Sequence, residues 1–365
     1  MKAHRVLYHI RRLCVLLFLS VLGTTRLTAQ DSIPTTDTIM SRIVMYNVEN
    51  LFDTYDDPQT DDKDFLPDGV MHWDKAKYYD KLSRIAQVIS DMGQWRYPGI
   101  VGLCEVENAQ VIKDLLHRRE LSKAAYHYAI TEGGDPRGID VALLWDPRVY
   151  RNIRLREVPA YPLEDNRLWT NYHEKLPLHG GRHALWATFR HIATKEVIEV
   201  LVVHSPSRRQ GTRSTAKQRS MVMSRIRRII DEIQSTSPDR HIILMGDFND
   251  NPTDRSITLA LQAKTPLRSD SIDPLSIYNM SAPTYMTRHG SHRHKGRAWL
   301  PDQIIVSGSL LIRRAGGLRL TQQATRVFDP EYLRQKNGNP KRSFRGNHYA
   351  YGYSDHFPVY IDIRY

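Results

Sequence analysis

The stretch 245–249, Met-Gly-Asp-Phe-Asn, constrains the fold of this 365-residue chain more than any other segment. It follows the apolar run 240–244, which predicts a buried β-strand. Asp247 and Asn249 are two residues apart, so in extended backbone both side chains project to the same side. A turn that ends the strand explains these two residues equally well. The rest of the chain favours a ligand site, because the pattern recurs there.

Polar side chains end several other apolar runs in the same way. Ligand and catalytic residues of α/β proteins gather at the ends of strands, where loops leave the sheet. One polar residue at such a place means little, because every buried strand has to end somewhere. Recurrence along the chain is hard to explain by turns alone, and it predicts one shared site. The residues in this pattern are Asn47, Glu49, Glu105, His204, Asp247, Asn249, Asp302, Asp355 and His356.

Predicted strands and helices alternate from residue 42 to residue 365 without a break in composition, which favours one α/β domain. The predicted helices 73–92 and 213–234 each have an apolar face that recurs every three to four residues. The second helix carries Arg219 and Arg225 away from that face, as solvated surface or as a nucleic-acid contact. Predicted strands cover residues 42–46, 99–105, 126–130, 139–145, 183–190, 196–203, 240–244, 304–306 and 359–363.

The N-terminal residues 1–30 have the composition of a secretory signal peptide. A basic start precedes the apolar stretch 13–23, which is too short to span a bilayer. An uncleaved N-terminal anchor is the alternative. Residues 31–41 are polar and are predicted as a linker to the domain 42–365. We therefore expect an exported protein, periplasmic or secreted, with no stable membrane anchor after cleavage.

The net charge and the cysteine content limit the partners and the metal sites that this chain can have. Residues 1–30 hold five basic and no acidic side chains, so cleavage lowers the formal net charge from +12 to +7. A positive excess suits a polyanionic partner without naming it. Cys104 is the one cysteine that follows residue 30. This excludes an intrachain disulfide and a cysteine-based metal site in the mature chain.

The residue types at the strand ends point to phosphate chemistry. Carboxylates and carboxamides without cysteine suit a hard cation such as Mg²⁺, with Mn²⁺ or Ca²⁺ as alternatives. Such a cation neutralises phosphoryl oxygens and a departing alkoxide. A histidine held by an aspartate can act as a base or bind an oxyanion. The combination predicts metal-assisted attack of water on a phosphate ester.

In two predicted loops a metal site is an alternative interpretation. Residues 53–64 contain six aspartates and are predicted as a solvated acidic loop, with a calcium site as the alternative. Residues 288–297 form a basic loop in which His289, His292 and His294 are predicted to face solvent, with a zinc site as the alternative.

Seven short motifs, taken together and in this order, resemble those of the endonuclease/exonuclease/phosphatase superfamily. The resemblance implies a four-layer α/β sandwich, in which two central mixed β-sheets are flanked by helices and the site lies at one edge. The signal and the opening segment also resemble those of exported proteins from bacteroidete-type bacteria. The motifs are residues 46–50, 102–107, 137–140, 203–207, 246–249, 301–303 and 354–356.

The resemblance also implies roles for individual residues. Glu105 corresponds to the principal Mg²⁺ ligand, with Asn47, Glu49 and Asp355 nearby. Pro301 departs from the apolar strand residue that is usual at its position. Because proline restricts the backbone, it is expected to influence how Asp302 meets the histidine of the last motif.

The remaining implied roles concern catalysis and substrate binding. His356, oriented by Asp302, corresponds to the general base or to the group that binds the scissile phosphate. Asp247 corresponds to the residue that orients or activates the nucleophile or the leaving group. Asn249 and His204 correspond to holders of phosphate oxygens, and Arg137 and Asp140 to a substrate-side motif.

The predicted function is metal-dependent hydrolysis of phosphodiester bonds, by an endonuclease acting on DNA or RNA outside the cytoplasm. We expect a monomer. One alternative is a phosphatase, or a phosphodiesterase for phospholipids or small molecules, of the same superfamily. A second alternative is an exported binding protein without catalysis, because a fold alone does not establish turnover.

Overall fold

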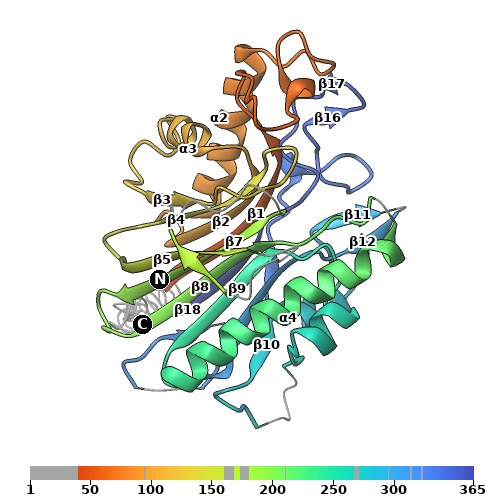
Figure 1. Cartoon of the computed structure of the whole chain (residues 1–365). Helices are drawn as coiled ribbons and strands as arrows, with labels where there is room; N and C mark the ends of the chain where they lie inside the picture. The colour runs from red at the N-terminus through yellow and green to blue at the C-terminus, as the bar shows by residue number, and fades with distance from the viewer. Residues whose placement is uncertain are drawn as a thin grey trace, which may run out of the picture. The chain divides into compact units, whose positions relative to one another are not determined.

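The computed structural model (Figure 1) describes residues 40–93, 96–159, 168–172, 181–209, 211–266, 271–294, 296–312, 315–321 and 324–365. The predicted signal peptide and residues 31–39 of the predicted linker lie outside the described residues. Strand β1, Met40–Leu51, begins two residues inside that linker. Among the described residues, no helix is both long and apolar enough to cross a membrane.

The first sheet is built around β1, which pairs in parallel with β2 and antiparallel with β18. Parallel and antiparallel pairs therefore occur in one sheet, as the predicted mixed architecture requires. The order is β14-β18-β1-β2-β4-β3, and β15 also pairs with β18. The bounds are β2 Ile100–Val106, β3 His127–Ile130, β4 Asp140–Trp145, β14 Arg319–Leu320, β15 Arg326–Val327 and β18 Val359–Arg364.

The second sheet is built around the parallel pair β8 and β9. The order is β10-β13-β9-β8-β7-β5-β6, and the pairs other than β8–β9 are antiparallel. The bounds are β5 Tyr150–Pro159, β6 Thr170–Asn171, β7 His183–His191, β8 Val197–His204, β9 His241–Asp247, β10 Ile277–Asn279 and β13 Asp302–Ser307.

Three helices cover the outer faces of the two sheets. Helix α2, Lys75–Met92, and helix α3, Ala109–Leu116, pack on the first sheet, and helix α4, Thr212–Thr236, packs on the second. Side chains at the N-termini of α2 and α3 stabilise their first turns, because Asp74 and Asn108 accept hydrogen bonds from backbone N–H groups. Helices α2 and α4 lie where the sequence periodicity predicts them.

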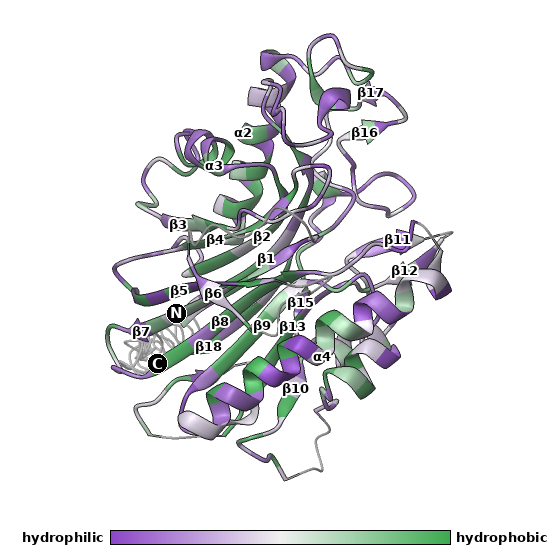
Figure 2. Ribbon diagram, viewed as in Figure 1, coloured by the Kyte–Doolittle hydropathy of each residue, from purple (hydrophilic) through white to green (hydrophobic). Residues whose placement is uncertain are grey.

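Apolar residues from the inner faces of the two sheets form a shared core. Met45 and Ile361 of the first sheet and Ile243 and Ile304 of the second belong to it, each with no exposed surface. Figure 2 shows the central strands mostly in the hydrophobic colour and the connecting loops mostly in the hydrophilic one. The layers are helix, sheet, sheet and helix, so the predicted four-layer sandwich is confirmed.

Several local predictions differ from the structure. Strand β5 is absent from the predicted strands, because its three arginines make the sequence resemble a loop. The predicted basic loop 288–297 contains instead part of the hairpin of β11, His292–His294, and β12, Arg297–Trp299. Arg219 and Arg225 were predicted on the polar face of α4, but both are buried. Arg219 pairs with Asp250 at 2.8 Å, and this contact compensates the buried charge.

The remaining described elements are short. They are β16 Phe344–Arg345, β17 His348–Tyr349, α5 Ser281–Met286, η1 Lys63–Phe65, η2 Ser256–Ala260, η3 Gly308–Leu310 and η4 Glu331–Leu333. The hairpin β16–β17 and the segment 342–356 bring the C-terminal part of the chain beside the end of β1.

Gly246 allows β8 and β9 to pair closely at the end that carries Asp247. A Cβ atom at position 246 would lie 1.9 Å from the carbonyl oxygen of Val203 on the adjacent strand. The glycine of the 245–249 stretch thus serves strand pairing within the sheet.

We expect Gly246→Ala to lower the free energy of unfolding by about 1–3 kcal/mol, the usual effect of overpacking a rigid core. Chemical denaturation monitored by circular dichroism measures the difference. Lys217→Ala on α4 is the control, because Lys217 is exposed and surface substitutions change stability by no more than about 0.5 kcal/mol. Equal stability of the two variants would contradict the interpretation of Gly246.

Candidate active site

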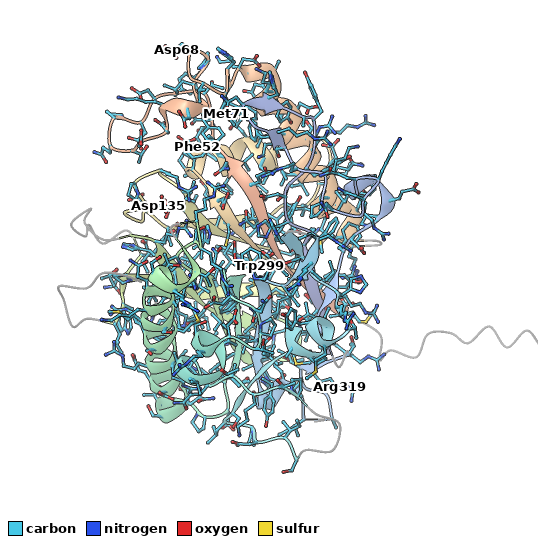
Figure 3. The ribbon with its side chains drawn as sticks, turned by 90° about the vertical axis from the view of Figure 1, so that its right-hand side faces the viewer. Phe52, Asp68, Met71, Asp135, Trp299 and Arg319 are labelled. Atoms are coloured by element: carbon cyan, nitrogen blue, oxygen red, sulfur yellow. The ribbon has the colours of Figure 1, made fainter. Side chains whose placement is uncertain are left out.

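The predicted strand-end residues meet at one edge of the sandwich, in a cleft with a volume of about 1530 Å³. Strands β1, β2, β8 and β9 end there, and the pairing of Asp302 with Asp247 brings the start of β13 to the same place. Asp355 and His356 lie in the loop that leads into β18. Phe52, Asp135 and Trp299 also line the cleft, and Figure 3 shows them between the labelled Asp68 and Arg319.

Glu105 enters the cleft because β2 is irregular at this position. The register with β4 shifts between Cys104 and Val106, and the Glu105 backbone has a φ of +66°. Its Oε2 accepts a hydrogen bond of 2.9 Å from the Asn50 N–H, and its Oε1 lies 3.4 Å from Asn47 Nδ2. A carboxylate held in this way keeps lone pairs directed at the cleft.

Asn47 links the ends of the two sheets. Its Nδ2 donates a hydrogen bond of 2.9 Å to Asp247 Oδ2, and its Oδ1 accepts one of 3.0 Å from the Glu49 N–H. Asn47 is buried, so these bonds fix the orientation of the carboxamide. The structure therefore brings Asn47, Glu105 and Asp247 together, as the sequence predicts.

Glu49 lies behind this group and is held by two different segments, the one that contains Arg342 and Ser343 and helix α2. Its Oε2 accepts a hydrogen bond of 2.6 Å from the Ser343 N–H, and Arg342 Nε lies 3.6 Å from its Oε1. Lys81 Nζ donates to the Glu49 carbonyl oxygen. The pKa of Glu49 is raised to about 7, mainly by burial and then by Asp355, against the opposing effect of Lys81.

His356 and Asp302 form a buried pair. His356 Nδ1 lies 2.6 Å from Asp302 Oδ2, and Ser291 Oγ donates to the same carboxylate oxygen at 2.5 Å. Burial lowers the pKa of His356, but Asp302, with Asp355 and Asp247, outweighs this and holds it well above its usual value. Pro301 therefore does not prevent the contact that the sequence predicts.

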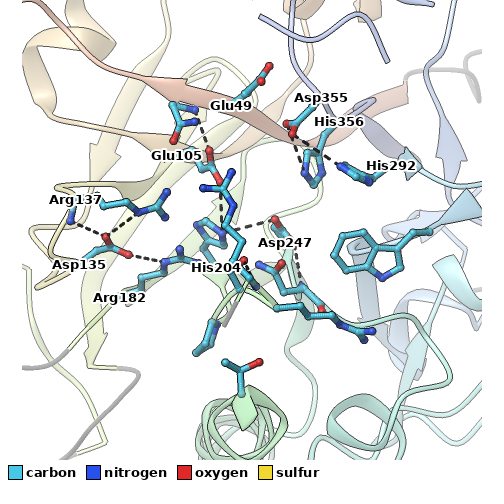
Figure 4. Close-up of a pocket in the computed structure, with 18 of the residues that line it drawn as sticks. Glu49, Glu105, Asp135, Arg137, Arg182, His204, Asp247, His292, Asp355 and His356 are labelled. Carbon is cyan, nitrogen blue, oxygen red and sulfur yellow. Dashed lines mark hydrogen bonds and ion pairs between the residues drawn. The ribbon is translucent and has the colours of Figure 1, made fainter. Parts of the chain in front are cut away.

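Asp247 and His204 form the floor of the cleft (Figure 4). Asp247 Oδ1 accepts a hydrogen bond of 2.8 Å from the N–H of Asn249, whose backbone φ is +50°. Burial raises the pKa of Asp247 to about 6, with Asp302 as the next contribution. Burial lowers the pKa of His204 well below its usual value, and Arg182 and Arg137 lower it further, so the imidazole is neutral.

Two arginines lie on one side of these groups, around Asp135 (Figure 4). Arg182 Nε donates a hydrogen bond of 2.8 Å to Asp135 Oδ2, and Arg137 Nε lies 3.6 Å from Asp135 Oδ1. Burial lowers the pKa of Arg137, against the opposing effect of Glu105 and Asp135. Arg137 lines the cleft, as predicted for a substrate-side residue.

Asp140 differs from its predicted place, because it is not among the residues that line the cleft. It is buried below the adjoining turn, where its Oδ1 accepts hydrogen bonds of 2.6 Å from Thr131 Oγ1 and 2.9 Å from the Gly133 N–H. Burial raises its pKa to about 7. Asp140 stabilises the turn that precedes Arg137, and its assignment to substrate binding stays a prediction.

Sequence reasoning missed several residues that shape the site. Lys81 lies inside a helix with ordinary periodicity, so no local signal distinguishes it from a surface lysine. Arg182 and Arg208 line the cleft, but each lies in a stretch with several other basic residues. His292 belongs to the predicted loop 288–297, and Ser291 has no signal apart from its proximity to that loop.

The donors of the cleft fit a divalent cation. Their oxygens are carboxylates and carboxamides, the ligands that hard cations prefer. The carboxylates raise one another's pKa, and Asp302 Oδ1 is buried with no hydrogen-bond partner. A cation would relieve both effects. Two groups have ligand atoms within 4.8 Å of one another: Asp247, Asp302 and His356 form one, and His292, Asp355 and His356 form the other.

Comparison with known proteins agrees with this geometry. A sequence profile described as the Endonuclease/Exonuclease/phosphatase family matches residues 42–365. No curated protein sequence gives a significant match. Three solved structures have a similar fold, and at identities below 25% each shows the fold alone.

An endonuclease/exonuclease/phosphatase family protein from Bacteroides thetaiotaomicron is 16% identical with a TM-score of 0.52, covering 90% of this chain and 95% of that one. D. rerio TDP2 complexed with a single-strand DNA product is 12% identical with a TM-score of 0.51, covering 89% and 99%. A mannosyl-6-phosphatase from Bacteroides thetaiotaomicron is 15% identical with a TM-score of 0.50, covering 88% and 99%.

Lys81 supports the backbone that holds Glu105. Its fully buried Nζ contacts the carbonyl oxygens of Glu49 and Asn50, two residues with positive φ. Asn50 in turn donates its N–H to the Glu105 carboxylate. Removal of the ammonium leaves buried carbonyls without their donor, which destabilises by about 1–3 kcal/mol.

We therefore expect Lys81→Met to lower the free energy of unfolding by about that amount and to weaken divalent-cation binding. Denaturation and calorimetric titration with Mn²⁺ measure the two effects. Lys75→Met is the control from the same helix, since Lys75 is exposed and its loss changes stability by no more than about 0.5 kcal/mol. A Lys81→Met protein with unchanged stability would contradict this role.

Proposed function

The chain belongs to the Endonuclease/Exonuclease/phosphatase family, and from this premise we propose that it is a divalent-metal-dependent phosphodiesterase acting on nucleic acid. Members of the family are phosphoric ester hydrolases. One observation carries the proposal. A buried Asp302–His356 pair opens into the same cleft as the carboxylates of Glu105, Asp247 and Asp355.

The pKa shifts of His356 and Asp247 support a role for each residue in the reaction. His356 donates through Nδ1 to Asp302 and holds its proton at neutral pH, because its pKa is raised. A protonated imidazole cannot be the base, so we assign it to binding a phosphoryl oxygen through Nε2. Asp247, with a pKa of about 6, is ionised at pH 7 and can accept the proton of the attacking water.

The neutral groups of the floor complete the arrangement. The Asn249 side chain donates through Nδ2 to the Ser205 carbonyl oxygen at 3.0 Å, and this fixes its position beside Asp247. Neutral His204 can donate one hydrogen bond to a phosphoryl oxygen without adding a charge. Preorganised donors of this kind stabilise the negative charge that develops in the transition state.

We propose Mg²⁺ as the physiological cation, with Mn²⁺ or Ca²⁺ as alternatives. Glu105, with Asn47 and Asp355 and with Glu49 behind them, would hold it through oxygen ligands. When bound, the ion neutralises phosphoryl oxygens and the leaving group.

Size and charge favour a polymeric anion as substrate. The cleft exceeds the roughly 300–1,000 Å³ of ordinary small-molecule pockets. Arg137 and Arg182 lie on one side of Glu105, and the hairpin that carries His292 lies on the other (Figure 4). That hairpin supplies Arg293 and Arg297 to the cleft. A phosphate chain can pass from one set of arginines to the other, which favours internal cleavage.

The location and the assembly state are proposed from the sequence. We propose that the protein is exported through residues 1–30 and acts in the periplasm or outside the cell as a monomer. Detection of the mature protein, starting near residue 31, in periplasmic or culture fractions tests export. Retention of an intact N-terminus in the membrane fraction would overturn it.

We expect the purified protein to nick supercoiled plasmid in Mg²⁺, and chelator to stop the reaction. His356→Ala is expected to reduce the rate by about 10²–10⁴-fold, the usual contribution of a positioned proton-carrying group. Glu105→Gln is expected to raise the Mg²⁺ concentration that is required. Gel densitometry of nicked plasmid measures both effects.

The control is His289→Ala, whose exposed side chain lies outside the residues that line the cleft. Full activity of both His356→Ala and Glu105→Gln would reject the mechanism. Cleavage of sugar phosphates or phospholipid head groups without loss of plasmid would replace the nucleic-acid assignment. Absence of turnover on all these esters would favour a binding protein.

Contacts with phosphates should depend on salt. We expect Arg137→Ala to weaken binding of a single-stranded oligonucleotide and to make the slope of log K against log salt shallower by about 0.7, the value for one phosphate contact on a single strand. Fluorescence anisotropy with the inactive His356→Ala protein measures this slope. Arg151→Ala is the control, because Arg151 is exposed on β5 and does not line the cleft. Identical slopes would exclude Arg137 from substrate binding.

A further inference from the structure

His292 is fixed beside the last motif by contacts of its neighbours. The Ser291 hydroxyl donates to Asp302, and the Ser291 carbonyl oxygen accepts a hydrogen bond of 2.7 Å from the Phe357 N–H. The backbone immediately before His292 is therefore tied both to β13 and to the start of β18. The imidazole also packs edge-on against Trp299, its cross-strand partner, with ring centroids 5.3 Å apart.

Two imidazoles face one carboxylate at this place. His292 Nε2 lies 3.9 Å from Asp355 Oδ2, and His356 Nε2 lies 3.8 Å from Asp355 Oδ1. The two imidazole centroids are 4.8 Å apart. One ligand atom of each residue lies within 4.8 Å of the other two. Small side-chain movements would bring all three atoms to the distances of a common cation, which are near 2.0–2.2 Å for zinc.

The surroundings have the features of a metal-binding histidine site. His356 is bonded through Nδ1 to a buried carboxylate, which orients the ring and presents Nε2 to the cleft. Histidines that bind metals commonly have such a carboxylate partner on the other nitrogen. All three residues line the open cleft, so an ion can reach them and a water can occupy a fourth position. Arg342, which contacts Asp355 at 3.3 Å, has an exposed side chain that can move away.

This donor set differs in kind from the one around Glu105. Two imidazole nitrogens and one carboxylate suit borderline cations such as Zn²⁺, whereas Mg²⁺ prefers oxygen ligands. We propose that His292, Asp355 and His356 form a second cation site, selective for Zn²⁺ over Mg²⁺, and that its occupation inhibits the enzyme. The inhibitory part rests on the proposed function, and the binding part does not.

Inhibition follows from the shared residues. A Zn²⁺ ion bound to His356 Nε2 occupies the atom that we assign to the phosphoryl oxygen. The same ion engages Asp355, which is then lost to the Mg²⁺ site. Because a metal-bound nitrogen carries no proton, the ion also removes the N–H donor that we assign to the phosphoryl oxygen.

Calorimetric titration with Zn²⁺ tests the binding directly, without any activity. We expect one Zn²⁺ to bind per chain, and His292→Ala to weaken this binding at least tenfold. His289→Ala is the matched control, a histidine three residues earlier with an exposed side chain, and it should bind like the unmodified protein. Co²⁺ is a second probe, because its visible absorption bands should appear in the control and be lost in His292→Ala. Thermal unfolding of His292→Ala and His292→Gln separates loss of the site from loss of the fold.

A second experiment measures how Zn²⁺ inhibits plasmid nicking at saturating Mg²⁺ in the His292→Ala and His289→Ala proteins. Relative to its own rate without Zn²⁺, His292→Ala should require at least tenfold more Zn²⁺ for half inhibition than His289→Ala. Equal Zn²⁺ affinity of the two folded variants in calorimetry would overturn the site. Zinc binding that depends on His292 in a protein without nicking activity would keep the site and reject the proposed function instead.

Discussion

The shared apolar core between the two sheets fixes where the strands end, and the site depends on this constraint. Met45 on β1 and Ile243 and Met245 on β9 belong to the same core cluster. Their burial holds the ends of β1 and β9 within one hydrogen bond of each other, from Asn47 to Asp247. The polar residues that follow these strands therefore meet without a dedicated binding domain. A change in sheet packing would increase the distances between the carboxylates, even if the local structure around each one were unchanged.

Much of this arrangement could be predicted from the sequence, because apolar runs with polar ends reveal both the strands and the residues after them. Glu105, Asp247 and His356 were found in this way. The parts that were missed depend on pairing between distant segments. Strand β5 is held by β7, although its own arginines resemble a loop. Arg219 can be buried because it forms an ion pair with Asp250. No local sequence pattern predicts this partner.

Buried charge distinguishes this site from an ordinary strand end. Glu49 and Asp247 have raised pKa values because they are desolvated close to other carboxylates. Lys81 supplies a fixed positive charge behind them, but it is bound to backbone carbonyl oxygens and cannot move toward substrate. Opposite charges attract strongly in a low-dielectric site. A mobile cation on the cleft side would therefore stabilise these carboxylates. This attraction is the physical argument for the proposed metal-dependent reaction.

The donor atoms on the two sides of the cleft favour different cations. On the side of Glu105 the nearest donors are oxygens, and a hard ion is favoured. On the side of Asp355 the hairpin β11–β12 adds the nitrogen of His292 to that of His356, and a borderline ion is favoured. The two sides share Asp355, so the two ions compete for one carboxylate. A loop that the sequence predicts as solvent-exposed thus sets the metal preference of the catalytic edge, through a single imidazole held in place by Ser291.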